Sequence, residues 1–505
     1  MSLLSRRLPR RDALFGGLFG GLFFSLAPLF PRALSAAEPV PVVPDGRRDV
    51  VVVGSGVAGL CAAIAAREAG AERVTVLEKG PLLGGHSLYS SGSIAVVFPE
   101  GVGEFSDSPE LFLEDAMRVG SEAGNPEVLL RIAEGSYAAL RWLEGMGVVF
   151  GRPFVAHNGI RSRSVAMPGN SAGRSYVLAL ARRAARLGVE IRLNATVTKL
   201  RRPYYSGGAW DVLGRTRSGS DFQLSSGAVV LATGGFTANV QRRLKINPLL
   251  TADVMTTANP YGTVWDGASG DGLDLAEAVG GKILTGFGLQ MLPFWGGRLL
   301  DYAGGDIYVD LSGRRFVDEA QTWNRVAEHI LRLPERKFWV ITDSRSYKGA
   351  TLGLKLINGI VRKAESVREM ASAMRVSAAV LDETLTAYNR AAREGFDPQT
   401  GKRVFTQTIE TPPFYFGEEH IYVHTTLDGI APDVNANVLD RSGAPVEGLY
   451  AAGEVAGGIF GTDRLGGAGL TNCLVMGRRA GAEAARVARG ATGATAAKSS
   501  AAKPA

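Results

Sequence analysis

The chain has 505 residues, 46% of them hydrophobic and 21% charged, which is typical of a globular protein with two or three domains. Its net charge is +7, but residues 1–37 carry five arginines against one aspartate and residues 490–505 add two lysines, so the rest carries only +1. This balance excludes a basic face for nucleic acid. Cys61 and Cys473 fit no metal or haem-attachment spacing, so we expect neither group in this chain and place both thiols in the core.

The N-terminal segment, residues 1–37, has the layout of a secretory signal peptide. Arg10 and Arg11 precede an apolar stretch of about 18 residues, near the minimum for a membrane span, and the small residues Ser35–Ala37 end the segment. The arginine pair resembles that of twin-arginine signals, which export proteins already folded around their cofactors. We expect cleavage and a periplasmic protein, with an uncleaved membrane anchor as the alternative. Residues 38–47 are expected to be an extended, proline-rich linker.

The first expected strand–helix–strand unit carries a dinucleotide-binding fingerprint. A β-branched strand over 49–53 leads into the glycine-rich run 54–59, and an alanine-rich helix follows over 60–69. A second strand over 73–77 ends at Glu78. Glycines permit a tight turn and the approach of a pyrophosphate to the helix N-terminus, where free N–H groups bind anions. Glu78 is placed to accept hydrogen bonds from a ribose, so the unit predicts a nucleotide cofactor.

Alternating helices and strands continue this pattern to residue 280. We expect helices over 109–147 and 176–187 and strands over 189–200 and 228–231, the last of them ending near a glycine pair. The alternation predicts an α/β class and a Rossmann-like domain.

The rest of the chain divides into an insertion, a return to the first domain and a tail. Residues 281–419 contain more aromatic residues, scattered prolines and a helix-rich section, so we expect an inserted α+β domain there. Residues 420–489 bring another strand-to-glycine turn and a closing helix, and we expect them to rejoin residues 48–280 in one domain. Residues 490–505, rich in Ala, Ser, Thr and Gly, are expected to be a disordered tail.

Motifs in three parts of the chain carry a resemblance to a known family. They are Val51–Gly59 with Leu77–Lys79 and Gly84–Ser87, Leu231–Phe236 with Ser269–Gly272 and Gly313–Glu319, and Gly448–Gly458 with Arg464–Leu470. In this order they resemble the FAD-binding subunit family of fumarate reductases, succinate dehydrogenases and flavocytochromes c, which includes 3-ketosteroid dehydrogenases. The resemblance implies a Rossmann-like FAD-binding domain in two sequence segments, 48–280 and 420–489, with 281–419 as a capping domain over the substrate.

The resemblance also implies FAD as the cofactor. The expected contacts are Gly54, Gly56, Ala58, Gly59, Glu78, Lys79, Gly85, His86, Ser87, Gly92, Val197, Ala232, Thr233, Gly234, Asp271, Glu454, Gly469 and Leu470. The closing helix, beginning near Leu470, would aim its N-terminus at the flavin, and Glu454 would bind ribityl or ribose hydroxyls. His86 matches the position where membrane-bound members attach FAD covalently. We expect non-covalent FAD, with a histidyl link at His86 as the alternative.

The substrate site that the resemblance implies is only partly retained. Arg464 matches the arginine that holds a substrate carboxylate, a pairing favoured by matched geometry and charge. His424 and Glu319 match further catalytic positions. The family's second substrate histidine is Leu292 here, and its proton-donating arginine is Trp323.

A different group must therefore transfer the proton, and a different substrate is expected. The candidates for proton transfer are Arg325, Tyr302 and Tyr308, in that order. Leu292 and Trp323 favour a larger and less charged substrate than fumarate.

We expect an FAD-dependent oxidoreductase that moves a hydride between flavin N5 and a CH–CH or C=C bond next to a carboxylate or ketone. Its partners would be that small molecule and a separate cytochrome, quinone or oxygen. The alternatives are a flavin oxidase or hydroxylase that shares only the FAD domain, and a flavoprotein that has lost its catalytic pocket.

Overall fold

The computed structural model describes residues 47–102, 106–167, 172–293, 299–300, 302–348 and 351–500, without the side chains of residues 172 and 490–500. The expected signal peptide and all of the expected linker except Arg47 lie outside these residues.

An eight-stranded sheet contains strands from both ends of the described chain. Its order is β17 (Asn437–Leu439), β18 (Pro445–Ala451), β8 (Asp221–Leu231), β1 (Arg48–Val53), β2 (Val74–Leu77) and β5 (Glu190–Arg192), and β7 (Trp210–Thr216) pairs with both β8 and β6 (Ala195–Arg201). The strands from β18 to β5 are parallel. Residues 50–53 of β1 are buried because both faces of the sheet are covered, which accounts for their β-branched sequence. The predicted α/β class is confirmed.

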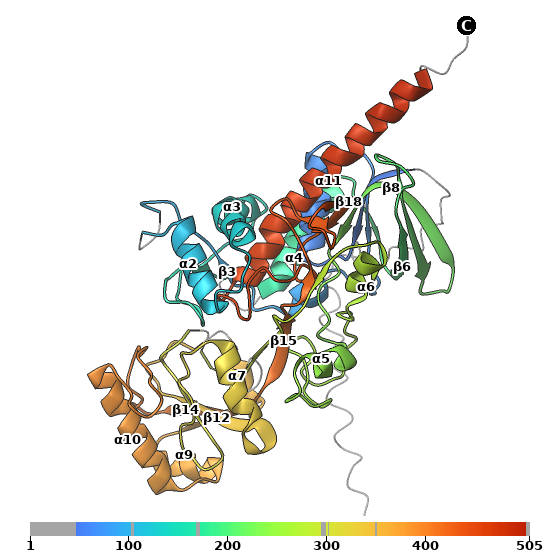
Figure 1. Cartoon of the computed structure of the whole chain (residues 1–505). Coiled ribbons are helices and arrows are strands. Elements are labelled where there is room, and N and C mark those ends of the chain that lie inside the picture. Colours follow the sequence, from blue (N-terminus) through green and yellow to red (C-terminus); the bar gives the residue numbers. More distant parts are fainter. Residues whose placement is uncertain are drawn as a thin grey trace, which may run out of the picture. The chain divides into compact units, whose positions relative to one another are not determined.

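Two helices, α1 (Val57–Glu68) and α11 (Ala468–Ser500), pack against each other beside this sheet (Figure 1). They approach closely, since a β-carbon on Gly477 of α11 would lie 2.6 Å from the carbonyl oxygen of Ala58 in α1. Helix α11 continues to Ser500. The alanine content of its last part favours a helix.

The predicted helical region over 109–147 consists of two helices, α2 (Pro109–Val119) and α3 (Pro126–Glu144). The Asn125 side chain caps α3 by accepting a hydrogen bond of 3.2 Å from the N–H of Val128. An asparagine before a proline is a helix-start signal, and it marks the boundary that the apolar pattern alone does not show.

A second, four-stranded antiparallel sheet lies within the expected insertion. Its order is β11 (Ile307–Val309), β12 (Lys337–Thr342), β14 (Phe414–His420) and β13 (Val361–Ala364), and α9 (Val367–Met374) and α10 (Ala378–Glu394) lie with it (Figure 1). This group has a hydrophobic core of its own, which contains Trp339, Tyr388 and Phe416. The core spans residues 307–416, inside the segment expected to form a capping domain.

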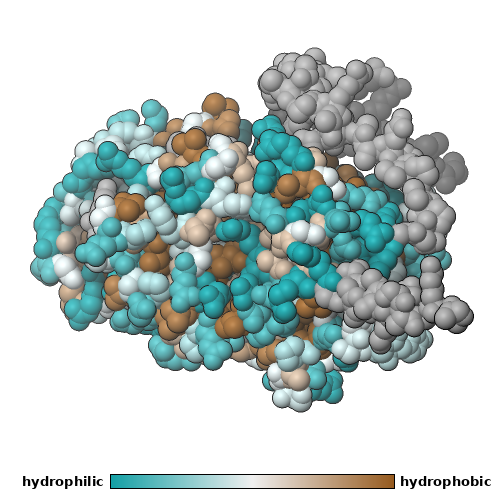
Figure 2. Space-filling view, turned by 90° about the horizontal axis from the view of Figure 1, so that it is seen from above, coloured by the Kyte–Doolittle hydropathy of each residue, from teal (hydrophilic) through white to brown (hydrophobic). Residues whose placement is uncertain are grey.

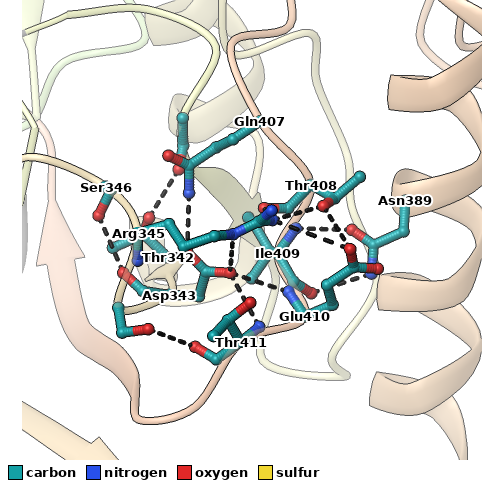
Figure 3. A network of polar contacts seen from close by, with 12 residues as sticks. Thr342, Asp343, Arg345, Ser346, Asn389, Gln407, Thr408, Ile409, Glu410 and Thr411 are labelled. Carbon is teal, nitrogen blue, oxygen red and sulfur yellow. Dashed lines mark hydrogen bonds and ion pairs between the residues drawn. The ribbon is translucent and has the colours of Figure 1, made fainter.

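A hydrogen-bond network around Asp343 lies at the end of β12 in this second group of elements (Figure 3). The buried carboxylate of Asp343 accepts hydrogen bonds of 2.8–3.0 Å from the N–H groups of Arg345, Glu410 and Thr411 and from the Gln407 amide. One carboxylate therefore ties the loop that precedes β14 to the end of β12.

Two short antiparallel ladders carry the chain between the two sheets. β9 (Ile283–Leu284) pairs with β16 (Gly429–Ile430), and β10 (Leu289–Leu292) pairs with β15 (Tyr422–Thr426). The chain leaves the first sheet through β9 and β10 and returns to it through β15 and β16. Side chains of the second ladder therefore lie at the boundary where the site forms.

Further elements complete the described part of the chain. They are η3 (Gly85–Tyr89), β3 (Ile94–Ala95), β4 (Ser164–Val165), α4 (Ala172–Arg186), α5 (Val240–Ile246), α6 (Asp271–Ala278), α7 (Trp323–Leu331), η4 (Pro334–Arg336) and α8 (Leu352–Ile357). Figure 2 shows one face of the molecule, on which hydrophilic residues predominate and hydrophobic ones form small groups. Among the described helices, none is both long and apolar enough to cross a bilayer.

Candidate active site

Two adjacent cavities lie near the carboxyl ends of the parallel strands and the first turn of α11. The sheet cavity has a volume of about 380 Å³ and is lined by residues that follow β1, β2, β8 and β18. The Arg464 cavity has a volume of about 230 Å³ and is lined by Arg464, the first turn of α11, the β10–β15 ladder and the loops over 86–93 and 154–166. The two cavities share His86, Ser87, Tyr89, Ala258, Glu454 and Cys473 in their walls.

All but one of the residues expected to contact FAD line these cavities. Gly92, Gly469 and Leu470 line the Arg464 cavity, and His86, Ser87 and Glu454 line both. The sheet cavity is lined by Gly54, Gly56, Ala58, Glu78, Lys79, Gly85, Val197, Ala232, Thr233, Gly234 and Asp271.

Gly59 is the residue that does not line either cavity. A β-carbon on Gly59 would lie 2.0 Å from the carbonyl oxygen of Gly54. This glycine lets α1 pack closely against the end of β1.

Glu78, at the end of β2, holds the glycine turn in place. Its carboxylate accepts hydrogen bonds from the N–H of Ser55 at 3.0 Å and from the hydroxyl of the same residue at 2.6 Å. Behind this turn, α1 begins at Val57, and its N-cap, Gly56, has no side chain to cap the helix. The helix N-terminus therefore borders the sheet cavity with N–H groups and a dipole that favour an anion such as a pyrophosphate.

Two buried polar atoms of the sheet cavity, Thr233 Oγ1 and Asp271 Oδ1, have no hydrogen-bond partner among the described residues. The other carboxylate oxygen of Asp271 lies 2.8 Å from Lys79 Nζ, which also donates to the Ser269 hydroxyl at 2.8 Å. Buried polar atoms are rarely unpaired in native proteins. A ligand with hydroxyl groups and ring nitrogens, such as a nucleotide, would satisfy them.

His86 pairs with Asp266 where the two cavities meet. Its Nε2 atom lies 2.6 Å from Oδ1 of Asp266. Burial acts to lower the pKa of His86, but the hydrogen bond and the charge of Asp266 outweigh it and raise the pKa. The ring nitrogen Nε2 is thus bound to a carboxylate rather than exposed to the cavity.

Arg464 presents a cation to its cavity. No hydrogen bond or ion pair joins its guanidinium to another side chain within the described part of the chain. Burial lowers the pKa of Arg464, although the carboxylates of Asp463 and Glu454 act in the opposite direction. A partly buried cation without a partner is costly, so the cavity suits a carboxylate or another oxygen with negative charge.

The backbone around Arg464 is fixed by a network centred on Asp463. The buried carboxylate of Asp463 accepts hydrogen bonds from Asn158 Nδ2 at 3.0 Å, from the N–H of Asn324 at 2.9 Å, from the N–H of Arg464 at 2.8 Å, and from the Gln290 amide. Burial raises the pKa of Asp463 in spite of these donors. Through these hydrogen bonds, Asp463 fixes the conformation of the loop that carries Arg464.

His424 lies in the Arg464 cavity, with Leu292 and Trp323 in the same wall. His424 Nδ1 lies 2.8 Å from Thr257 Oγ1, a hydrogen bond that fixes the plane of the ring. Much of the remaining wall is apolar and includes Phe154, Ala156, Ala166, Ile459 and Phe460.

The structure does not place Arg325 or Glu319 in this cavity. Arg325 is exposed and lies 3.6 Å from Glu328, because a residue two positions after Trp323 points to the opposite side of α7. Glu319 is buried between Lys402 and Arg315, with side-chain distances of 2.7 and 2.8 Å.

The two tyrosines expected to transfer the proton also lie outside the cavity wall. The Tyr302 hydroxyl accepts a hydrogen bond of 3.1 Å from the N–H of Tyr347. Tyr308 is buried and packs against Phe338 with ring centroids 5.1 Å apart. Their positions in the second sheet and its adjoining loop direct both side chains into the capping region.

Sequence reasoning missed His157, Asn158 and Asp266. His157 lines the Arg464 cavity and stacks on Trp323, with ring centroids 3.6 Å apart. The chain has only five histidines, and the run His157-Asn158-Gly159 combines one of them with a turn signal. That combination marks a loop that can carry a reactive side chain, but only the fold shows which cavity wall the loop reaches.

The chain is similar to several known proteins. A family model described as an FAD binding domain matches residues 49–470. Urocanate reductase of Eggerthella lenta is 32% identical over 474 residues, which are 88% of this chain and 76% of the relative. The open conformation of a flavocytochrome c3 fumarate reductase is 28% identical with a TM-score of 0.68, covering 88% of this chain and 79% of the other. The 3-ketosteroid-Δ4-(5α)-dehydrogenase from Rhodococcus jostii RHA1 shares the fold, with a TM-score of 0.65 and 24% identity over 89% of this chain and 99% of that one.

Proposed function

Since the chain belongs to the FAD binding domain family and is similar to FAD-dependent oxidoreductases that act on carbon–carbon bonds, we propose that it exchanges a hydride with a CH–CH or C=C bond next to a carboxylate or ketone. The observation that carries this proposal is the guanidinium of Arg464, which has no side-chain partner among the described residues and lies in a cavity whose wall includes Leu292, Trp323 and Phe460. An anchoring cation next to these apolar side chains favours a substrate with one polar end and a larger body than fumarate.

The residues present fit FAD. The pyrophosphate would lie at the N-terminus of α1, and the adenosine ribose near Glu78. The flavin would lie where the two cavities meet, beside Glu454 and the first turn of α11, whose dipole favours negative charge on the ring. When bound, FAD supplies the hydride donor or acceptor.

Arg464 and His424 are the groups that would hold the polar end of the substrate. A guanidinium binds a carboxylate with two parallel hydrogen bonds, or a ketone oxygen on which negative charge develops. The network around Asp463 fixes the backbone of Arg464, so that a substrate held there would have its carbon–carbon bond oriented toward the flavin.

The cellular setting is proposed from the sequence. Arg10 and Arg11 before an apolar stretch support export to the periplasm by residues 1–37. We propose a separate cytochrome, quinone or oxygen as the electron partner, and FAD held without a covalent bond.

Anaerobic flavin spectra of the full-length holoenzyme test the function. Photoreduced enzyme is mixed with cinnamate, fumarate or 2-cyclohexenone, and oxidised enzyme with 3-phenylpropanoate or cyclohexanone. We expect cinnamate or the cyclic enone to restore the oxidised spectrum faster than fumarate does. Absence of any response, with FAD bound, would contradict the proposal, and bleaching by amines with peroxide release would replace it with an oxidase.

A further inference from the structure

The proposed reaction needs a group that gives or takes a proton at the carbon next to the one that exchanges a hydride. Arg325, Tyr302 and Tyr308 lie outside the cavity wall, and Trp323, at the position of the family's arginine, has no proton to give at neutral pH. A titratable group from another element is therefore required.

We propose that His157 transfers this proton. Its side chain lines the Arg464 cavity, and the residue is only 6% exposed. Its Nε2 atom lies 3.2 Å from the carbonyl oxygen of Gln321. Because a carbonyl oxygen only accepts, Nε2 carries hydrogen in this arrangement, and the ring exchanges its second proton at Nδ1.

Trp323 gives the imidazole a fixed plane and a favourable charge environment. The two rings are nearly parallel, at an interplanar angle of 20° and a centroid distance of 3.6 Å. The face of an indole attracts a cation, so the contact favours the protonated ring. The aromatic residue at the arginine position thus supports a proton donor that comes from the loop over 154–166.

Hydrogen bonds join His157 to the residue that would hold the substrate. The His157 carbonyl accepts from the N–H of Gly466 at 3.2 Å. The adjacent Asn158 donates to the Arg464 carbonyl at 2.9 Å and accepts from the N–H of Trp323 at 3.0 Å. The φ of Asn158 is 67°, a left-handed conformation that asparagine tolerates well. His157 and Arg464 therefore belong to one rigid frame, as oriented catalysis requires.

His424, Glu454 and Cys473 are other titratable groups that line the cavity. His424 binds Thr257, and the Glu454 carboxylate accepts a hydrogen bond of 2.9 Å from the N–H of Thr426. Burial raises the pKa of Cys473 to about 12, which keeps it a thiol. Among the described residues, Arg464 and Glu454 line the same cavity as His157, and Asp463 binds the adjacent Asn158; His424 is a further titratable group in this wall.

In the reducing direction, FAD would supply a hydride, with its two electrons, for the β-carbon of the substrate. The π electrons of the C=C bond move toward the carbonyl, and negative charge develops on the oxygen at Arg464. The imidazolium of His157 gives its proton to the α-carbon and becomes neutral, and water restores that proton. In the dehydrogenating direction, neutral His157 takes the proton from the α-carbon.

The test rests on the proposed function and uses the full-length holoenzyme with cinnamate. In His157→Gln we expect kcat to fall about 100-fold or more with little change in KM, since proton transfer by a side chain contributes that much. The limb of the pH profile that reports the histidine should disappear, and added imidazole should partly restore kcat in His157→Ala. The FAD content and the visible flavin spectrum should match the wild type.

The matched control is His329→Gln, which alters an exposed histidine on α7, the helix that begins at Trp323. It should behave as the wild type. If the wild type reacts but His157→Gln keeps its kcat and its pH profile, the assignment of His157 is wrong and the proposed function stands. If the wild type is inert toward the whole panel, both fail.

Discussion

Lys402 Nζ lies 2.7 Å from Oε2 of Glu319, and both side chains are buried in the capping region. Arg315 binds the same carboxylate and also Asp397. In Glu319→Gln, the buried cations Lys402 and Arg315 would keep only the Asp397 carboxylate. We expect a loss of about 3–5 kcal/mol in the free energy of unfolding, measured by urea denaturation at pH 7.

The pH dependence of this pair has a definite sign. Burial acts to raise the pKa of Glu319, but Lys402 and Arg315 outweigh it and lower the pKa from 4.5 to about 2. The stability that Glu319 adds is therefore complete above pH 4.5 and is lost as the pH falls toward 2. The gap in the free energy of unfolding between wild type and Glu319→Gln should shrink over that range. The exposed control Glu383→Gln should match the wild type throughout. A constant gap would contradict this.

Arg464→Lys keeps the charge of the anchoring residue and removes its planar pair of donors. We expect KM for cinnamate to rise about 10- to 100-fold, the range of a lost charge-assisted hydrogen bond, at unchanged FAD content. Steady-state kinetics and flavin absorbance measure the two quantities. Arg486→Lys, in the exposed part of α11, is the control. An unchanged KM would show that Arg464 does not hold the substrate.

Asp266→Asn tests the pair that joins the two cavities. The raised pKa of His86 means that its stabilisation is complete below its ordinary value of 6.5 and is lost as the pH rises through the folded pKa. Lys79 and Glu454 act on the same ring, so the comparison with wild type isolates Asp266. The loss of thermal stability should be larger at pH 6 than at pH 9. A loss of thermal stability that grows with pH would contradict a stabilising His86–Asp266 pair.

Gly234→Ala should impair FAD binding more than folding. Gly234 lines the sheet cavity at φ 73°, and no atom lies within 4 Å of the β-carbon that alanine would add, so the methyl group would take cofactor space. Gly219→Ala is a matched control, because Gly219 has φ 90° and equally open surroundings but lies in the β7–β8 turn. We expect similar small losses of stability and reduced FAD content only in Gly234→Ala. Equal FAD content would contradict this.

The cofactor side of this molecule was predictable from the sequence because its signals are local. The turn at 54–59 and Glu78 need only one strand–helix–strand unit to define their place. Family membership, shown by the match over residues 49–470, confirms the resemblance on which the second segment was assigned.

The substrate side was not predictable, because its geometry depends on which side of an element a residue faces. Arg325 lies only two positions after Trp323, yet α7 directs Arg325 to solvent and Trp323 to the cavity. His157 comes from a loop far from both in sequence, and only tertiary packing brings its ring onto Trp323.

The sheet order has a consequence for biosynthesis. β18 and β1 both pair directly with β8, although the two strands come from opposite ends of the described chain. The walls of the sheet cavity run from Val53 to Cys473, so this cavity is complete only when almost all of the chain has left the ribosome. Until β18 is made, residues 229–231 of β8 lack their partner strand on one edge, and an unpaired strand edge exposes the nascent chain to aggregation. FAD would therefore bind a nearly complete polypeptide, before the export that we propose for residues 1–37.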